Sequence, residues 1–257
     1  MTDERVVAAM AYERPNEAWA KRVGDVLDAR FVLVLDAPED PTAPEYADST
    51  LVSRSRLGFG RARRTSMRLA AELGDPCLVT DGDGQYPPSA LARIFDRLEE
   101  TGADVVIPQR RARSVWMEVN GDRVDRLPFE RLETLCAFEA AGPDATADLD
   151  PTFDCQPGAF GFRAEAVPDA LPTDSGWLAD WEITVRALES ARYATVDVST
   201  TAGPQEETVF EWDDQCAKFE RIDDFLDRGV RAVYEDHRGR FDESQRDDLE
   251  RAIAEAV

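Results

Sequence analysis

Two carboxylates one residue apart, Asp81 and Asp83, follow the short apolar run 77–79. The glycines beside them let the backbone turn tightly, and Pro87 and Pro88 delay the start of the next helix. Hard oxygen ligands at the end of a buried strand suit Mg²⁺ or Mn²⁺ that carries a diphosphate. The spacing therefore predicts a site for a metal ion and phosphate.

Alternating strands and helices must position this site. Apolar runs predict strands at residues 6–11, 31–35, 77–80 and 103–107. Amphipathic runs predict helices after Pro15 and over residues 62–73 and 90–100. This alternation is typical of an α/β fold with a mostly parallel sheet, in which ligands bind beyond the carboxyl ends of the strands. The segments that follow those ends begin at Asp36, Gly58, Asp81 and Gln109.

The chain is less regular beyond residue 110. Its charge, Pro143 and Ala-rich stretches predict an irregular insertion over residues 111–150. A helix is expected over 177–191 and a strand over 194–198. Apolar residues at helical spacing after Asp213 predict C-terminal packing helices.

The composition restricts the partners and the setting. The formal net charge is −23, from 53 acidic and 30 basic residues, and Lys21 and Lys218 are the only lysines. Such a surface repels nucleic acid and anionic lipid, so neither is an expected partner. It suits a salt-rich cytoplasm, where ions screen the self-repulsion. No apolar run is long enough for a transmembrane span, so we expect a soluble, cytoplasmic protein that contacts membranes only through a partner or transiently.

The motifs resemble those of family 2 glycosyltransferases of the GT-A fold, and in particular those of dolichyl-phosphate sugar synthases. The family's Asp at the end of the second strand is matched by Asp36. Its Gly-x-Gly-x-Ala-x-x-Thr segment is matched by Gly58, Gly60, Ala62 and Thr65, and its Asp-x-Asp-x-Gln-x-Pro-Pro motif by Asp81, Asp83, Gln85, Pro87 and Pro88. The resemblance covers about the first two thirds of the chain and, with the charge, suggests a halophilic archaeal origin.

The resemblance implies transfer of a sugar from a nucleotide donor such as a UDP- or GDP-sugar. Mg²⁺ or Mn²⁺ would lie on Asp81, Asp83 and Gln85 and neutralise charge on the leaving group. The donor-binding residues would be Tyr12, Glu13, Asp36, Gly58, Gly60, Arg64, Asp81, Arg110 and Arg163.

The acceptor side is less defined. By resemblance it would include Asp154, Gln156, Gly158 and Trp181, and either Asp180 or Glu182 would act as general base for an alcohol. A lipid phosphate is already an anion and would need no base. A glycan, a lipid phosphate and a small molecule all stay open as acceptors.

The expected fold is a GT-A-like, Rossmann-like parallel sheet flanked by helices, followed by C-terminal helices. Residues 1–110 would form its nucleotide-sugar-binding half, residues 111–205 its acceptor-side half and residues 206–257 a helical extension. Two other functions stay open: a non-catalytic sugar-nucleotide-binding or scaffold protein of the same fold, and a phosphatase like the haloacid dehalogenases. A calcium loop is excluded, because Ala92 stands where a bidentate Glu is required.

Overall fold

The computed structural model describes residues 4–110, 116–119, 122–150, 152–173, 176–190, 192–201 and 212–257. It divides into two compact units. The first comprises Met1–Ala112 and Pro157–Gln205, and the second comprises Arg113–Gln156 and Glu206–Val257. These bounds differ from the three consecutive segments expected from the sequence. The difference arises because residues 113–156 fold with the C-terminal helices, as the stacking of Phe129 on Phe219 illustrates.

A seven-stranded sheet forms the centre of the first unit, with strand order β3-β2-β1-β4-β8-β5-β9. The strands are β1 (Val6–Tyr12), β2 (Arg30–Asp36), β3 (Ser49–Ser53), β4 (Cys77–Asp81), β5 (Val105–Arg110), β8 (Ala159–Phe162) and β9 (Tyr193–Val198). All run parallel except β8, which is antiparallel to both β4 and β5. The α/β fold with a mostly parallel sheet is thus confirmed.

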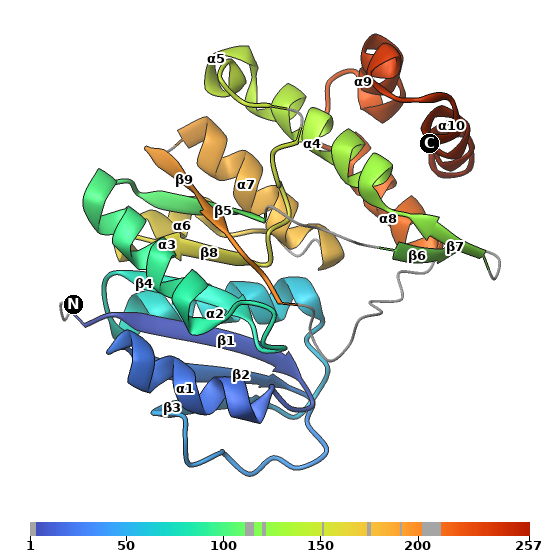
Figure 1. The fold of residues 1–257 in the computed structure, drawn as a ribbon. Helices are drawn as coiled ribbons and strands as arrows, with labels where there is room; N and C mark the ends of the chain where they lie inside the picture. Colours follow the sequence, from blue (N-terminus) through green and yellow to red (C-terminus); the bar gives the residue numbers. More distant parts are fainter. Residues whose placement is uncertain are drawn as a thin grey trace. The chain divides into compact units, whose positions relative to one another are not determined.

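Helices cover both faces of this sheet (Figure 1). On one face lie α1 (Glu17–Leu27) and α3 (Pro88–Thr101), and on the other lie α2 (Phe59–Leu73), α6 (Val167–Ala170) and α7 (Ala179–Ser190). The strands alternate between the two cores: Val7 and Ala9 join the core under α1 and α3, and Met10 joins the core under α2. Burial on both faces explains why the strand sequences are continuously apolar.

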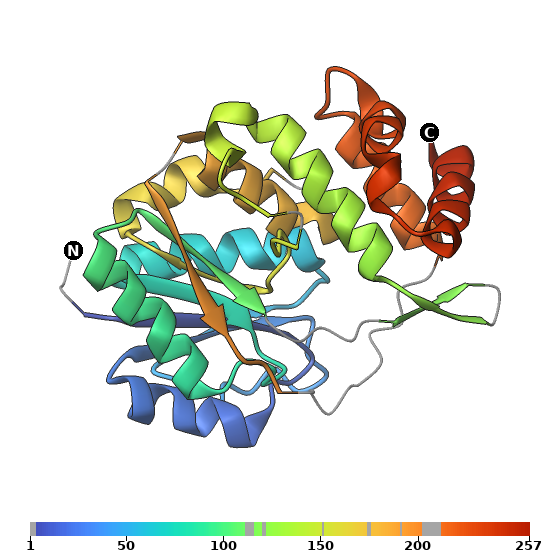
Figure 2. The ribbon, with the colours of Figure 1, turned by 45° about the horizontal axis from the view of Figure 1, so that its top comes forward.

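The second unit consists of a hairpin and helices (Figure 2). Its elements are β6 (Trp116–Val119), β7 (Asp122–Asp125), α4 (Leu127–Ala141), α5 (Pro143–Thr146), α8 (Trp212–Asp223), α9 (Gly229–His237) and α10 (Glu243–Ala256). The described residues also contain three short 3₁₀ turns: η1 (Ala164–Ala166), η2 (Gly176–Leu178) and η3 (Arg238–Arg240). No helix of the described residues is both long enough and apolar enough to span a membrane.

The expectation of an irregular insertion over 111–150 is wrong for its described part. Helix α4 has 15 residues, and its buried positions include Glu130 and Glu133 as well as apolar side chains. Because buried positions surround the helix and include charged residues, the sequence shows no amphipathic stripe. Residues 111–115 and 120–121 of this segment lie outside the described residues.

Strand β8 has no clear periodic signal in the sequence, yet it joins the two halves of the sheet. Helix α3 packs directly on Gly161, which lies in the middle of strand β8. A Cβ atom built on Gly161 would lie 2.6 Å from Cγ2 of Ile94 and 2.8 Å from Cδ1 of Leu98. The absence of a side chain at Gly161 therefore sets how closely α3 approaches the sheet.

We expect Gly161→Ala to lower the free energy of unfolding by about 1–3 kcal/mol, because overpacking forces α3 away from β8. Gly24→Ala in α1 is the matched control, since its Cβ would make only ordinary contacts of 3.5 Å. Urea unfolding of both variants measures the difference. Equal stability of Gly161→Ala and the control would contradict the tight packing.

Candidate active site

The turn after β4 is folded tightly against the end of β1. The Gly82 amide donates to the Met10 carbonyl, and the Gly82 carbonyl accepts from the Asn16 amide, both at 2.7 Å. Gly84 has a φ of +86°, and a Cβ there would lie 2.8 Å from Nδ2 of Asn16. The Asn16 side chain also donates to the Asp83 carbonyl. Glycine is therefore required at position 84, both for its backbone angle and for its contact with Asn16.

Within the turn, one carboxylate oxygen of Asp83 accepts from the Gln85 amide at 2.9 Å. The Gln85 carbonyl accepts from the Thr201 amide, also at 2.9 Å. No hydrogen bond of the Gln85 side chain to another described residue occurs. The turn thus places Asp81, Asp83 and Gln85 together, with one Asp83 oxygen engaged by the backbone.

A buried guanidinium joins this turn to two other elements. Arg63, on α2, has no exposed surface. Its Nε and Nη2 donate to the two carboxylate oxygens of Asp180 at 2.8 and 3.1 Å, and Nη2 also donates to Asp81 at 3.0 Å. Nη2 further contacts the carbonyl of Gly158 at 3.1 Å. Arg63 therefore binds the ends of β4 and α7 and the residue before β8 in one cluster.

Burial dominates the electrostatics of the cluster. It raises the pKa of Asp81, an effect that Arg63 opposes and that Asp83 and Asp180 reinforce. Burial likewise raises the pKa of Asp83. For Arg63, burial lowers the pKa, but the nearby carboxylates of Asp180 and Asp81 outweigh it, so the pKa is raised. The carboxylates are therefore held in a setting that favours a neighbouring positive charge.

Gly158 completes the wall beside Asp81. Its φ is +77°, and a Cβ built there would lie 3.0 Å from Oδ2 of Asp81. Its carbonyl also accepts from the Asp81 amide at 3.2 Å. Because both the angle and the contact exclude a side chain, Gly158 keeps the Asp81 carboxylate in place.

Asp36 organises the start of α2. Its carboxylate oxygens accept from the amides of Leu57 and Gly58 at 2.5 and 2.9 Å. Gly58 has a φ of +78°. A Cβ built on Gly60 would lie 2.8 Å from the backbone nitrogen of Gly176. The geometry thus gives Asp36, Gly58 and Gly60 roles in shaping the loop that leads to Arg63.

Tyr12, Glu13 and Arg110 also lie at the carboxyl edge of the sheet. Tyr12 ends β1 opposite Asp36 and is 56% exposed, and its ring lies under the guanidinium of Arg56 at 5.0 Å. Glu13 follows with a φ of 63°. Arg110 ends β5 and acts on the pKa of Asp81, which it lowers. This edge therefore holds most of the residues that the sequence assigned to the donor.

Of the other two arginines predicted for the donor, Arg163 lies elsewhere and Arg64 is engaged by backbone carbonyls. Arg163 follows β8, and because that strand is antiparallel, the residue emerges at the opposite edge of the sheet from Asp81. There its guanidinium lies 3.7 Å from the Asp75 carboxylate. Arg64 donates to the carbonyls of Pro172 and Thr173 at 3.0 and 3.3 Å. The expectation that Arg163 joins the donor residues is thus corrected by the strand direction.

Glu182 and Trp181 are enclosed in the packing of α7. Both oxygens of Glu182 accept from the Thr173 amide at 2.9 Å, and one also accepts from Arg186 at 2.7 Å. The Trp181 ring has no exposed surface. Of the two carboxylates predicted as a general base, Asp180 is the one bonded to Arg63 in the described part of the chain.

Asp154 and Gln156 belong to the second unit and are described within it. Asp154 is buried and accepts from the Gln156 amide at 3.1 Å. The Gln156 side chain donates to Glu133 and accepts from Lys218 at 2.9 Å. In this unit both residues take part in a buried polar network.

Arg63 is not among the site residues predicted above, although it stands beside Arg61 and Arg64 in the sequence. A helical signal was present, because Gly60, Met67 and Ala70 share the buried face of α2 with Arg63. An arginine at a core position of a helix is a candidate for a buried ion pair. Its place on the buried face of the helix therefore distinguishes Arg63 from its neighbours Arg61 and Arg64.

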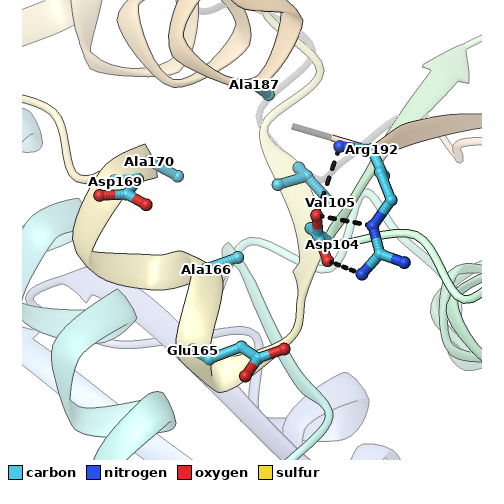
Figure 3. A pocket seen from close by; sticks show the side chains of 8 residues that line it. All are labelled: Asp104, Val105, Glu165, Ala166, Asp169, Ala170, Ala187 and Arg192. Carbon is cyan, nitrogen blue, oxygen red and sulfur yellow. Dashed lines mark hydrogen bonds and ion pairs between the residues drawn. The ribbon is translucent and has the colours of Figure 1, made fainter. Parts of the chain in front are cut away.

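A cavity of about 320 Å³ lies at the amino edge of the sheet (Figure 3). It is lined by Asp104, Val105, Glu165, Ala166, Asp169, Ala170, Ala187 and Arg192. The Arg192 guanidinium reaches across to Asp104 at 2.7 Å. The cavity and the Arg63 cluster therefore lie at opposite ends of the parallel strands.

We expect Arg63→Met to lower the free energy of unfolding by about 3–5 kcal/mol, because it leaves the buried Asp180 without its counter-ion. The double variant Arg63→Met with Asp180→Leu should recover part of this loss. Arg68→Met, at an exposed position of α2, is the control and should stay within about 0.5 kcal/mol of the wild type. Urea unfolding at constant salt gives the values, and a stable Arg63→Met single variant would refute the role of the ion pair.

Comparisons with known proteins place these features in context. A sequence profile described as Glycosyl transferase family 2 matches residues 26–167, more than half of the chain. No curated protein sequence matches this chain.

Among solved structures, TarS 1–349 of S. aureus is similar, with a TM-score of 0.51 and 15% identity over 90% of this chain and 68% of that one. The same fragment in complex with UDP-GlcNAc has a TM-score of 0.51, 14% identity, and coverage of 90% and 69%. This chain spans 41% of the longer TarS structure, at the same TM-score and 14% identity. The likeness is one of fold.

Proposed function

The chain belongs to glycosyl transferase family 2, and we propose that it moves a sugar from a nucleotide-sugar donor to an acceptor with the help of Mg²⁺ or Mn²⁺. The observation that carries this proposal is the cluster of Asp81, Asp83, Arg63 and Asp180 at the carboxyl edge of the sheet. In α/β sheets of this kind, ligands bind at that edge.

The carboxylates fit a magnesium or manganese ion that comes with substrate phosphates. Such ions are commonly held by one or two carboxylates while phosphates and water fill the other positions. Asp81 and Asp83 would hold the ion, with Gln85 beside them, and the ion would neutralise charge on the departing phosphate.

Arg110 would bind the donor phosphates, because it ends β5 at this edge of the sheet and brings a positive charge there. Arg63 has no exposed surface, so it would act on the site through Asp81 and Asp180, to which it donates. The exposed ring of Tyr12 offers a surface for the base of the nucleotide. A TarS structure contains UDP-GlcNAc, so UDP-sugars are the first donors to test.

Asp180 is the carboxylate that we assign to the acceptor. Arg63 orients both of its oxygens, whereas Glu182 is committed to Thr173 and Arg186. For an alcohol acceptor, Asp180 would take the proton as general base, which requires that one of its two oxygens leaves its hydrogen bond to Arg63.

We expect Asp83→Asn to reduce donor hydrolysis and sugar transfer on the order of 10²-fold, because it removes a fixed charge from the phosphate site. Asp25→Asn, at an exposed position of α1, is the matched control and should retain wild-type rates. The assay uses UDP- and GDP-sugars with Mg²⁺ or Mn²⁺ at high salt, with chelator as a further control. Donor binding without any turnover would indicate a scaffold, and phosphate release from small phosphoesters with no sugar-nucleotide binding would indicate a phosphatase.

We also propose that the protein works in a salt-rich cytoplasm, since its net charge is −23. The melting temperature should rise between 0.1 and 1 M KCl, as the screening length falls from about 10 to about 3 Å. The double variant Glu235→Lys with Asp247→Lys changes two exposed positions and should depend less on salt. A melting temperature that is independent of KCl would exclude the adaptation.

A further inference from the structure

We infer that the cavity at the amino edge of the sheet binds a small aliphatic amine. The ammonium group would lie at the mouth of the cavity and the alkyl chain on its floor. All of the lining residues belong to the first unit, and the volume of about 320 Å³ is at the lower end of the range for small-molecule sites. Strand β5 begins at the cavity with Val105 and ends at the opposite edge with Arg110, so this site is separate from the proposed sugar transfer.

The floor of the cavity is apolar and consists of small side chains. Val105 of β5, Ala170 of α6 and Ala187 of α7 are buried there. Ala166 of η1 is half-buried beside them, and Figure 3 shows the side chains of Ala166 and Ala170 directed toward Val105. Because these short side chains do not fill the space between the three elements, the floor offers an apolar surface to a short alkyl chain.

The mouth of the cavity is negatively charged. The Arg192 guanidinium donates to both carboxylate oxygens of Asp104, through Nη2 at 2.7 Å and through Nε at 3.2 Å, so the charges of these two residues offset each other. Glu165 and Asp169 are exposed and lie four residues apart along η1 and α6. Their carboxylates form no hydrogen bond or ion pair with any other residue that the structure describes. Two carboxylates are therefore available to a cationic ligand at the mouth.

Other classes of ligand suit this lining less well. A magnesium or calcium ion needs about six oxygen ligands, whereas the floor of the cavity consists of methyl groups. An anion would meet the carboxylates of Glu165 and Asp169, and Arg192 is already bound to Asp104. A neutral apolar molecule would remove water from the carboxylates without compensating their charge. An alkyl ammonium ion pairs its charge with the carboxylates while its chain covers the apolar floor.

The test measures the binding of propylamine, butylamine and pentylamine to the full chain by isothermal titration calorimetry. The KCl concentration is constant, and the pH is neutral, so that all three amines are charged. Each added methylene group should tighten binding by about two- to fourfold, because the chain is buried against the floor. Pentanol lacks the charge and tetramethylammonium lacks the chain, so both should bind more weakly than pentylamine.

Two variants separate the floor from the mouth. Ala166→Leu places a larger side chain in the cavity and should abolish the dependence of affinity on chain length. The double variant Glu165→Gln with Asp169→Asn keeps the floor and should weaken pentylamine binding about fivefold, because the ion pairs at the mouth are lost. The double variant Asp25→Asn with Glu72→Gln is the matched control, since it removes the same charge from exposed positions of α1 and α2, and it should bind as the wild type does.

Equal affinity for the three amines would overturn the inference, and so would an equal loss of binding in the mouth variant and its matched control. Either result would indicate that the amines bind to the acidic surface at large. Asp83→Asn, at the opposite edge of the sheet, should leave amine binding unchanged. A loss of binding in Asp83→Asn would place the amine on the active-site carboxylates and would also overturn the inference. The assay contains no sugar donor, so its result is independent of whether the protein transfers sugar.

Discussion

A fully buried arginine sets the strictest constraint on the first unit. Removing the Arg63 charge from water is costly, and only close, well-aligned carboxylates offset that cost. Asp180 supplies two such contacts and Asp81 a third. The position of α2 relative to β4 and α7 is therefore fixed by one side chain as well as by apolar packing.

The glycines around the cluster follow from this constraint. Gly60 allows η2 to approach α2, and Gly158 allows the chain to pass beside the Asp81 carboxylate. At both positions a Cβ would meet backbone or carboxylate atoms at about 3 Å or less, so the elements would have to separate. Because separation would weaken the hydrogen bonds of Arg63, the same close contacts that stabilise the fold also hold the chemical groups in place.

How much the sequence predicts depends on how local each feature is. The turn at Asp81 and Asp83 and the parallel strands were predictable, since both depend on short runs of neighbouring residues. The position of Arg163 at the opposite edge could not be predicted, because it depends on the direction of β8. The pairing of β8 with β4 and β5 determines that direction. Helix α4 was missed for a related reason: its charged residues, such as Glu133, are buried by partners distant in sequence.

Aromatic packing extends from the buried ion pair to an exposed ring. The Phe59 ring contacts the Arg63 guanidinium and also stacks on the Trp177 indole. The exposed ring is thus supported by a group whose own position is fixed by two carboxylates. A shift of Arg63 would reach Trp177 through Phe59, which contacts both groups. The position of an exposed ring therefore depends on a buried ion pair, because the aromatic packing around Phe59 starts from the guanidinium that the two carboxylates hold.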